Sequence, residues 1–190
     1  MKFYLDTEFI EDGTTIDLIS IGLVAEDGRK MYLQNADCKF SKASDWVWRN
    51  VFPSLKQFNM AGHRSCNAKS RSLDSKDTAR CYDNDCPWRG RYEIRAAVLE
   101  FCDAAKWGKP EFWGYYADYD WVVFCRLFGT MTTLPKGWPM YCRDIKQLCD
   151  DLGNPELPAQ SSQHNALLDA EWTQFAHQCL IALQATGRIE

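Results

Sequence analysis

The chain opens with Phe3-Tyr4-Leu5-Asp6-Thr7-Glu8-Phe9-Ile10, a mostly apolar run that nevertheless carries two carboxylates. Its apolar content predicts a strand buried in a sheet. Successive residues of a strand point to opposite faces, so Asp6 and Glu8 share one face. Two like charges on one buried face are unfavourable unless a cation lies between them. The stretch therefore predicts a divalent metal site whose other ligands come from elsewhere in the chain.

Two further strands are predicted directly after the first. Residues 15–24 are apolar and rich in β-branched side chains, and residues 30–34 follow the two-residue hairpin signal Asp27-Gly28. The chain is therefore expected to begin with an antiparallel three-stranded meander whose first strand bears the acids.

Shorter strands and helices alternate in the rest of the chain. Helices are expected at 46–52, 91–105, between Asp118 and Gly129, at 145–152 with Asp144 as cap, and at 165–186; strands are expected at 112–116 and 140–142. The buried stripe of the last helix is predicted to be Leu168, Trp172, Phe175, Cys179 and Leu183. This order predicts one α/β domain over residues 1–190, with a mixed sheet, the meander plus parallel strands, flanked by helices.

Residues 54–90 lack sustained periodicity, and we interpret them as an inserted polar flap. Residues 54–92 contain eight basic and four acidic side chains, so this region carries +4 and, with a net charge of −4, the remainder carries −8. A positive flap beside a negative site suits chemistry on a polyanion. The pairs His63-x-x-Cys66 and Cys81-x4-Cys86 leave a zinc site open, although the second spacing is wider than most structural zinc sites use.

The composition excludes several classes of protein. No 18-residue apolar run or basic-then-apolar leader is present, so neither a membrane span nor a signal peptide is expected. Nine cysteines are an odd number, and several fall among apolar residues of predicted helices. Buried free thiols in a reducing cytoplasm are therefore expected. The net charge of −4 argues against a protein that coats nucleic acid by bulk positive charge.

Three more residues are candidates for the site. Asp120 opens a helix just after an aromatic strand, although Asp118 competes for the same role. Asp169 lies near the first turn of the last helix, and His164 precedes it by five residues. On a regular helix these two would be about 140° apart, so His164 is expected just before the helix. An Asp at a helix start is usually a cap. Capping does not explain why two acids in an apolar strand are followed along the chain by an Asp after an aromatic strand and then by His164 and Asp169 at the last helix.

These motifs resemble those of the DEDDh 3′–5′ exonucleases, the ribonuclease H-like group that includes oligoribonuclease, ribonuclease T and the proofreading subunits of DNA polymerases. The matching pieces are Asp6-Thr7-Glu8, Tyr119-Asp120 and His164-x4-Asp169. With the strand order, the similarity spans nearly the whole chain outside residues 54–90. The wider motif form is similar to a small bacterial and phage branch related to a mycobacterial 3′–5′ exoribonuclease. The Tyr-Asp pairing favours Asp120 and leaves Asp118 as a helix cap.

The resemblance implies a metal-dependent 3′–5′ exoribonuclease that releases nucleoside 5′-monophosphates from single-stranded RNA. It implies two Mg²⁺ (or Mn²⁺) ions, with Asp6 bridging them and Glu8, Asp120 and Asp169 completing an oxygen-rich cage. His164 would then be the general base. A homodimer is implied by the same resemblance.

Substrate contacts are expected from residues near the acids. Thr7 lies between the two strand carboxylates, and Phe9 follows them. Phe9, Tyr116 and Trp88 are candidates for stacking on bases, a contact worth roughly 1–3 kcal/mol per base. For Phe9, a place in the core is the alternative.

Three other functions remain open at this stage. A DNA exonuclease or proofreading enzyme would share the site, because only a contact to the 2′-hydroxyl separates RNA from DNA there. A non-catalytic nucleic-acid-binding module would lack one of the four carboxylates or the histidine, whereas the chain has all five. An adaptor organised by the cysteines of the flap would require zinc.

Overall fold

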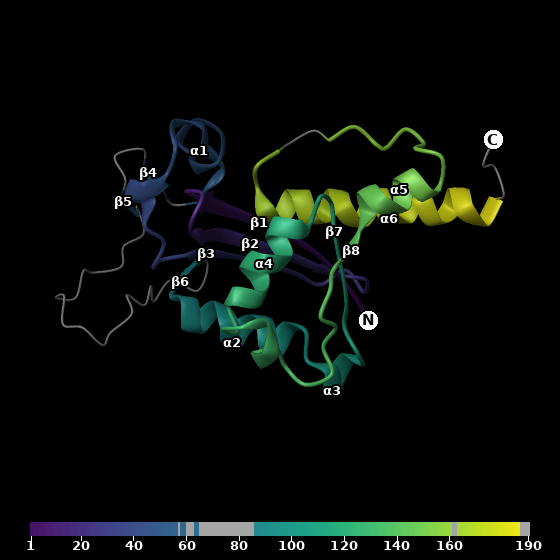
Figure 1. The fold of residues 1–190 in the computed structure, drawn as a ribbon, viewed down its shortest axis with the longest axis horizontal. Coiled ribbons are helices and arrows are strands. Elements are labelled where there is room, and N and C mark those ends of the chain that lie inside the picture. The colour runs from purple at the N-terminus through teal and green to yellow at the C-terminus, as the bar shows by residue number, and fades with distance from the viewer. Residues whose placement is uncertain (57, 60–62, 65–85, 161–162, 187–190) are drawn as a thin grey trace.

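The structure is a computed structural model that describes residues 1–56, 58–59, 63–64, 86–160 and 163–186 (Figure 1). Its strands are β1 (Lys2–Glu11), β2 (Ile16–Ala25), β3 (Lys30–Asn35), β4 (Phe58–Asn59), β5 (His63–Arg64), β6 (Trp88–Arg89), β7 (Glu111–Gly114) and β8 (Arg143–Asp144). Its helices are η1 (Phe40–Lys42), α1 (Asp45–Asn50), η2 (Phe52–Ser54), α2 (Arg91–Phe101), α3 (Ala104–Trp107), α4 (Asp118–Arg126), η3 (Met131–Thr133), α5 (Ile145–Asp151) and α6 (Ala166–Thr186). Most of the predicted flap, with Cys66 and Cys81 of the zinc alternative, lies outside the described residues.

The main sheet has six strands in the order β6-β3-β2-β1-β7-β8. β1, β2 and β3 pair antiparallel, whereas β7 is parallel to β1, β8 to β7 and β6 to β3. Gly28 has a φ of +90° in the predicted hairpin turn, a conformation that glycine adopts without strain. The expected mixed sheet, an antiparallel meander plus parallel strands, is confirmed.

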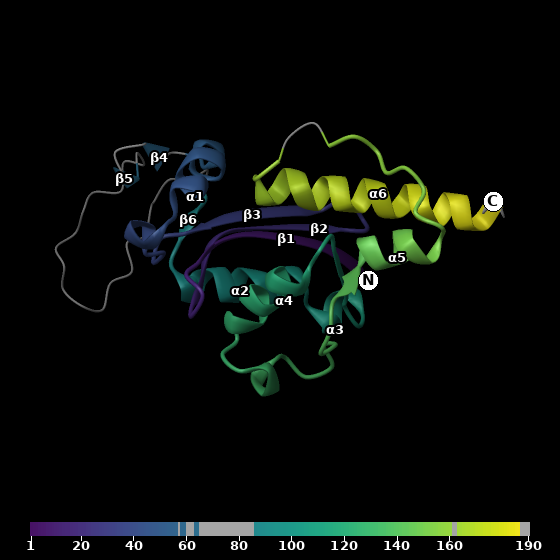
Figure 2. The same cartoon turned by 45° about the horizontal axis from the view of Figure 1, so that its top comes forward.

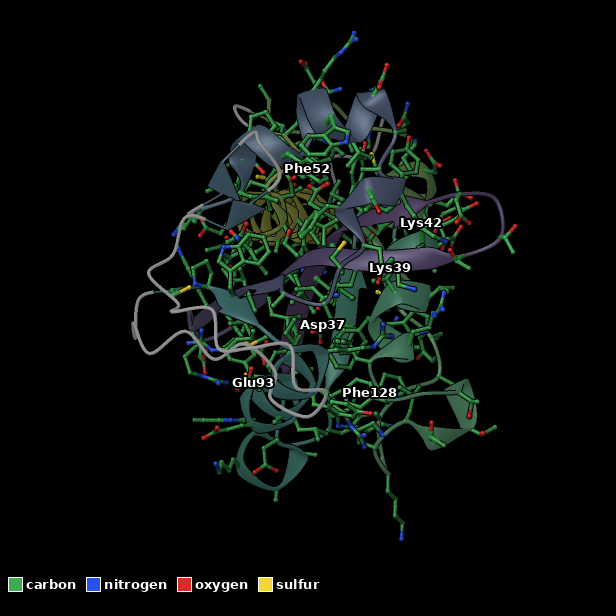
Figure 3. All side chains as sticks on the ribbon, turned by 90° about the vertical axis from the view of Figure 1, so that its left-hand side faces the viewer. Asp37, Lys39, Lys42, Phe52, Glu93 and Phe128 are labelled. Carbon is green, nitrogen blue, oxygen red and sulfur yellow. The ribbon has the colours of Figure 1, made fainter. Side chains whose placement is uncertain are left out.

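Helices cover both faces of this sheet (Figure 2). Phe3 and Leu5 of β1 belong to a core cluster on one face with residues of α2 and α4, whereas Tyr4 packs on the other face with residues of α5 and α6. Figure 3 shows Phe52 on the α6 side of the strands and Phe128 on the opposite side. The alternation along β1 therefore sends its even-numbered side chains, the two acids included, toward α6.

The buried side of α6 differs from the predicted stripe. Leu168 and Phe175 are 43% and 54% exposed, whereas the buried residues, apart from Leu180, are small or polar: Ala166, Asp169, Ala170, Thr173, Ala176, His177 and Leu180. The reason is a close approach of α6 to the sheet at Gly22, where an added Cβ would lie 2.0 Å from the carbonyl oxygen of Ala166. Small residues fit this narrow gap, and Leu168 and Phe175 lie outside it.

Three other expectations need correction. Trp88 is fully buried, in a cluster with Phe52, and its strand β6 pairs with β3, so residues 88–89 belong to the sheet and not to a flap. The helix expected at 91–105 ends at Phe101, because Asp103 caps a separate helix through the amide of Ala105. The strand expected at 140–142 lies instead at Arg143–Asp144.

The cysteines of the described chain are free thiols, in agreement with the expectation, and five of the seven are buried. Among the described residues, no helix combines the length and the apolar content that crossing a membrane requires.

Candidate active site

The two carboxylates of β1 lie on the face that α6 covers. Asp6 pairs with Gly22 and Glu8 with Ser20 in β2, and the register of the two strands shifts only after Glu8. The i, i+2 relationship of the acids is therefore intact. Glu8 is 8% exposed and Asp6 is half-buried.

Asp169 reaches these acids from the first turn of α6. Because Gly22 has no side chain, the N-terminal end of α6 rests directly on β2, opposite Asp6. One carboxylate oxygen from each of Asp6, Glu8 and Asp169 then lies within 4.8 Å of the other two. The cluster thus depends on the contact between the first two strands and the last helix.

Asp120 approaches from the other face of the sheet. Its Oδ1 accepts hydrogen bonds from the backbone amide of Thr7 (2.8 Å) and from the Thr7 hydroxyl (2.6 Å). Thr7 lies between the two strand acids and points toward α4, so it fixes Asp120 beside them. Asp120 is 8% exposed, whereas Asp118 is exposed on the same helix.

The assignment of Asp118 as a helix cap is wrong, because α4 begins at Asp118 and its cap position, Ala117, has no side-chain cap bond. Asp144 holds this turn instead, since its Oδ2 accepts from the amide of Ala117 at 2.8 Å. Asp144 also caps α5 through the amide of Lys146, as the sequence predicts. Thus one carboxylate orients the starts of two helices.

The acids repel one another in the absence of a cation. Burial, followed by the charges of Asp120, Glu8 and Asp169, raises the pKa of Asp6 well above its ordinary value. Burial and then the charges of Asp169 and Asp120 raise the pKa of Glu8 to about 8. Burial raises the pKa of Asp120 to about 6, although the Thr7 hydrogen bonds oppose it, and burial also raises that of Asp169. The site is therefore one that protons or cations stabilise.

The hydrogen bonds of the four carboxylates are unequal. Within the described chain, no donor reaches the carboxylates of Asp6 and Glu8, and Asp120 accepts through Oδ1 alone. Asp169 accepts at both oxygens, from the amide of Asn165 (3.0 Å) and from the side chain of Gln160. Hard divalent cations such as Mg²⁺ or Mn²⁺ prefer oxygen ligands, and these carboxylate oxygens have lone pairs that no hydrogen bond of the described residues uses. The four residues therefore fit such a cation.

His164 lies just before α6, as predicted, with a φ of +65°. Its carbonyl oxygen accepts a hydrogen bond from the Ser54 hydroxyl at 2.5 Å, and the side chain of Asn165 donates to the carbonyl of Ser54 at 3.3 Å. The Trp46 ring meets the imidazole edge to face, with 4.8 Å between the ring centres. In Figures 1 and 2, α1 lies beside the N-terminal end of α6. Residues far apart in sequence therefore hold the backbone of His164 and pack against its imidazole.

The predicted substrate contacts have different surroundings. Thr7 is buried and its hydroxyl already donates to Asp120. Phe9 stacks on Tyr119, with ring centres 5.9 Å apart and planes at 14°, and Tyr119 is 58% exposed. Tyr116 is 61% exposed and has a φ of +54°. Contact of Thr7, Phe9 and Tyr116 with substrate stays a prediction; stacking by the buried Trp88 is wrong.

The sequence reasoning missed the residues that hold the site in place. Trp46, Ser54 and Gln160 each contact a predicted site residue from a segment without a recognisable motif. Asn165 is the one supporting residue that a local pattern could have indicated. It lies at the start of the last helix, four residues before Asp169, where Asn and Asp side chains commonly cap the helix.

Comparison with known proteins identifies the family of the chain. The chain is 36% identical over 171 residues to the 3′-5′ exoribonuclease Rv2179c of Mycobacterium tuberculosis strain H37Rv and to its counterpart in strain CDC 1551, covering 90% of this chain and 87% of each relative. A chain from the structure of the yeast NOT1 MIF4G domain co-crystallized with CAF1 aligns with a TM-score of 0.42 and 10% identity, over 96% of this chain and 80% of that one, a likeness too weak to support an argument. The profile of the 3′-5′ exoribonuclease Rv2179c-like domain matches residues 1–180. The chain therefore belongs to the Rv2179c-like 3′-5′ exoribonuclease domain family.

Proposed function

We propose that this protein is a metal-dependent 3′–5′ exoribonuclease of the DEDDh type, with a ribonuclease H-like fold, that releases nucleoside 5′-monophosphates from single-stranded RNA. The supporting observation is that carboxylate oxygens of Asp6, Glu8 and Asp169 lie within 4.8 Å of one another. Asp120 is close enough for its charge to raise the pKa of Asp6, and His164 acts electrostatically on Asp169. RNA is the proposed substrate because the relatives from M. tuberculosis are named exoribonucleases.

The carboxylates of Asp6, Glu8, Asp120 and Asp169 would hold two Mg²⁺ or Mn²⁺ ions. Such ions, when bound, activate water and stabilise negative charge on the attacking and leaving oxygens. The chain contributes oxygen ligands whose positions Thr7 fixes for Asp120 and Asn165 for Asp169.

His164 would accept the proton of the attacking water. An imidazole is suited to this role near neutral pH. The hydrogen bond from Ser54 holds the backbone of His164 and the ring of Trp46 contacts its imidazole, at a place where His164 acts electrostatically on Asp169. The bond that breaks joins the terminal phosphorus to the 3′ oxygen of the penultimate nucleotide, and that oxygen leaves with the shortened RNA.

The charge of the cluster makes cations necessary for substrate binding as well. Ionised carboxylates repel a phosphate, and burial together with the neighbouring acids raises the pKa of Asp6 and of Glu8. Cations would displace the protons that Asp6 and Glu8 hold at neutral pH, so metal binding should release protons and become tighter as the pH rises.

The test is hydrolysis of matched 5′-labelled single-stranded RNA and DNA with Mg²⁺, with Mn²⁺ and with EDTA. Ladders that shorten from the 3′ end with Mg²⁺ or Mn²⁺, stop in EDTA and favour RNA are expected. Shortening of DNA alone would indicate a DNA exonuclease instead. No shortening of either polymer by folded protein with either ion would reject the proposal.

Variants separate the proposed roles. His164→Ala should lower the rate by ~10²-fold or more while metal binding persists, the typical effect of losing a general base. Asp120→Asn should abolish activity, whereas Asp118→Asn, an equivalent change at an exposed position on the same helix, should leave it unchanged. Equal loss in the two Asp variants would contradict the assignment of Asp120. Sedimentation of the purified protein tests the proposed homodimer.

A further inference from the structure

Residues 155–160, which lie between α5 and α6, are anchored at several points. The Pro155 carbonyl accepts a hydrogen bond from the thiol of Cys149 at 3.4 Å, and the Pro158 carbonyl accepts one from the indole of Trp172 at 3.0 Å. Leu157 packs against the core cluster between the sheet and α6. Two prolines further restrict the backbone. Gln160, two residues after Pro158, is therefore held in a defined place beside α6.

Gln160 uses this position to donate a hydrogen bond from its side-chain amide to Oδ1 of Asp169. The backbone amide of Asn165 donates to Oδ2 of the same carboxylate at 3.0 Å. Two donors, one at each oxygen, define the plane of the carboxylate. No comparable donors reach Asp6 or Glu8 within the described chain, so Asp169 is the acid whose orientation other residues fix most completely.

We propose that Gln160 is a positioning residue that orients the Asp169 carboxylate for divalent cation binding. This inference rests on the proposed function of the acid cluster. Each carboxylate oxygen has two lone pairs, so Oδ1 can accept from Gln160 and still bind a cation. An oxygen of Asp169 already lies within 4.8 Å of oxygens of Asp6 and Glu8 with Gln160 in place. Gln160 therefore holds the ligand in its binding arrangement and does not occlude it.

The test uses Gln160→Met, which keeps the length of the side chain and removes its donor. Gln163→Met is the matched control, because Gln163 lies three residues further on, is exposed and forms no hydrogen bond within the described chain. Calorimetric titration with Mn²⁺ alone, without RNA, should give a dissociation constant ~10-fold higher for Gln160→Met, the size of effect that outer ligand partners commonly have. The control should match the wild type.

Several outcomes separate this proposal from its alternatives. If Gln160→Met binds Mn²⁺ as well as the wild type but unfolds at a lower temperature in EDTA, Gln160 has only a structural role. Tighter binding by this variant would show that the amide competes with the cation. Either result rejects the positioning role and leaves the proposed function intact. A wild-type protein that binds neither Mn²⁺ nor Mg²⁺ would overturn both proposals.

Discussion

Replacing Glu8 with Gln should stabilise the metal-free protein at alkaline pH while abolishing activity. The folded state holds the Glu8 proton up to a pKa of about 8, whereas the unfolded chain releases it near the ordinary value of 4.5. The unfolded state therefore binds fewer protons than the folded state between these values, and the metal-free wild type loses stability as the pH rises through this window. Glu8→Gln removes this loss because its side chain stays neutral.

The magnitude follows from the width of that window. At 1.36 kcal/mol per pKa unit, ionisation of Glu8 lowers the free energy of unfolding by roughly 4 kcal/mol at pH 8 and by less than about 1 kcal/mol at pH 5. Glu8 is only 8% exposed, so solvent does little to screen this effect. Glu8→Gln should therefore exceed the wild type in stability by a few kcal/mol at pH 8 and be close to it at pH 5.

Urea unfolding in EDTA at pH 5 and pH 8 measures this difference directly. Glu156→Gln is a suitable control, since Glu156 is exposed and forms no ion pair within the described chain. Added Mn²⁺ should narrow the difference at pH 8, because the wild type gains about 2.7 kcal/mol at a metal concentration 100 times its dissociation constant and the variant gains less. If Glu8→Gln is no more stable than the wild type at pH 8 in EDTA, the reasoning about converging acids is wrong.

Three further changes test how the site is held together. Thr7→Val removes the hydroxyl donor to Asp120 and should lower kcat about 10-fold, since a hydrogen bond to a charged group contributes roughly 1.5–3 kcal/mol. Thr7→Ser keeps a hydroxyl and should retain the wild-type rate; a rate as low as that of Thr7→Val would contradict the role of the hydroxyl in holding Asp120. Gly22→Ala places a Cβ 2.0 Å from the backbone of α6 and should cost about 3 kcal/mol of stability in urea unfolding; a variant as stable as the wild type would refute the close approach. Trp46→Ala, at a side chain 55% exposed, should lower kcat several-fold without changing the melting temperature, because the ring contacts His164; an increase in KM alone would instead indicate substrate contact.

Local patterns predicted the parts of the fold and site that depend on neighbours in sequence. The shared face of Asp6 and Glu8 follows from the two-residue period of a strand, and the structure keeps that period up to the shift after Glu8. Asp144 caps α5, and His164 lies just outside α6, for equally local reasons. The choice between Asp118 and Asp120 needed a resemblance, and the structure agrees with it: only Asp120 is buried and bonded to Thr7.

The sequence by itself determined the order of the main elements, the face of the two strand acids and the helix starts, because each depends on residues a few positions apart. Only the tertiary structure decided which side of α6 is buried and which residues surround His164. The buried side of α6 is set by the missing side chain of Gly22, and the neighbours Trp46 and Ser54 come from more than a hundred residues away. Such contacts depend on how closely two surfaces approach, and a hydrophobic period in one of them carries no information about that distance.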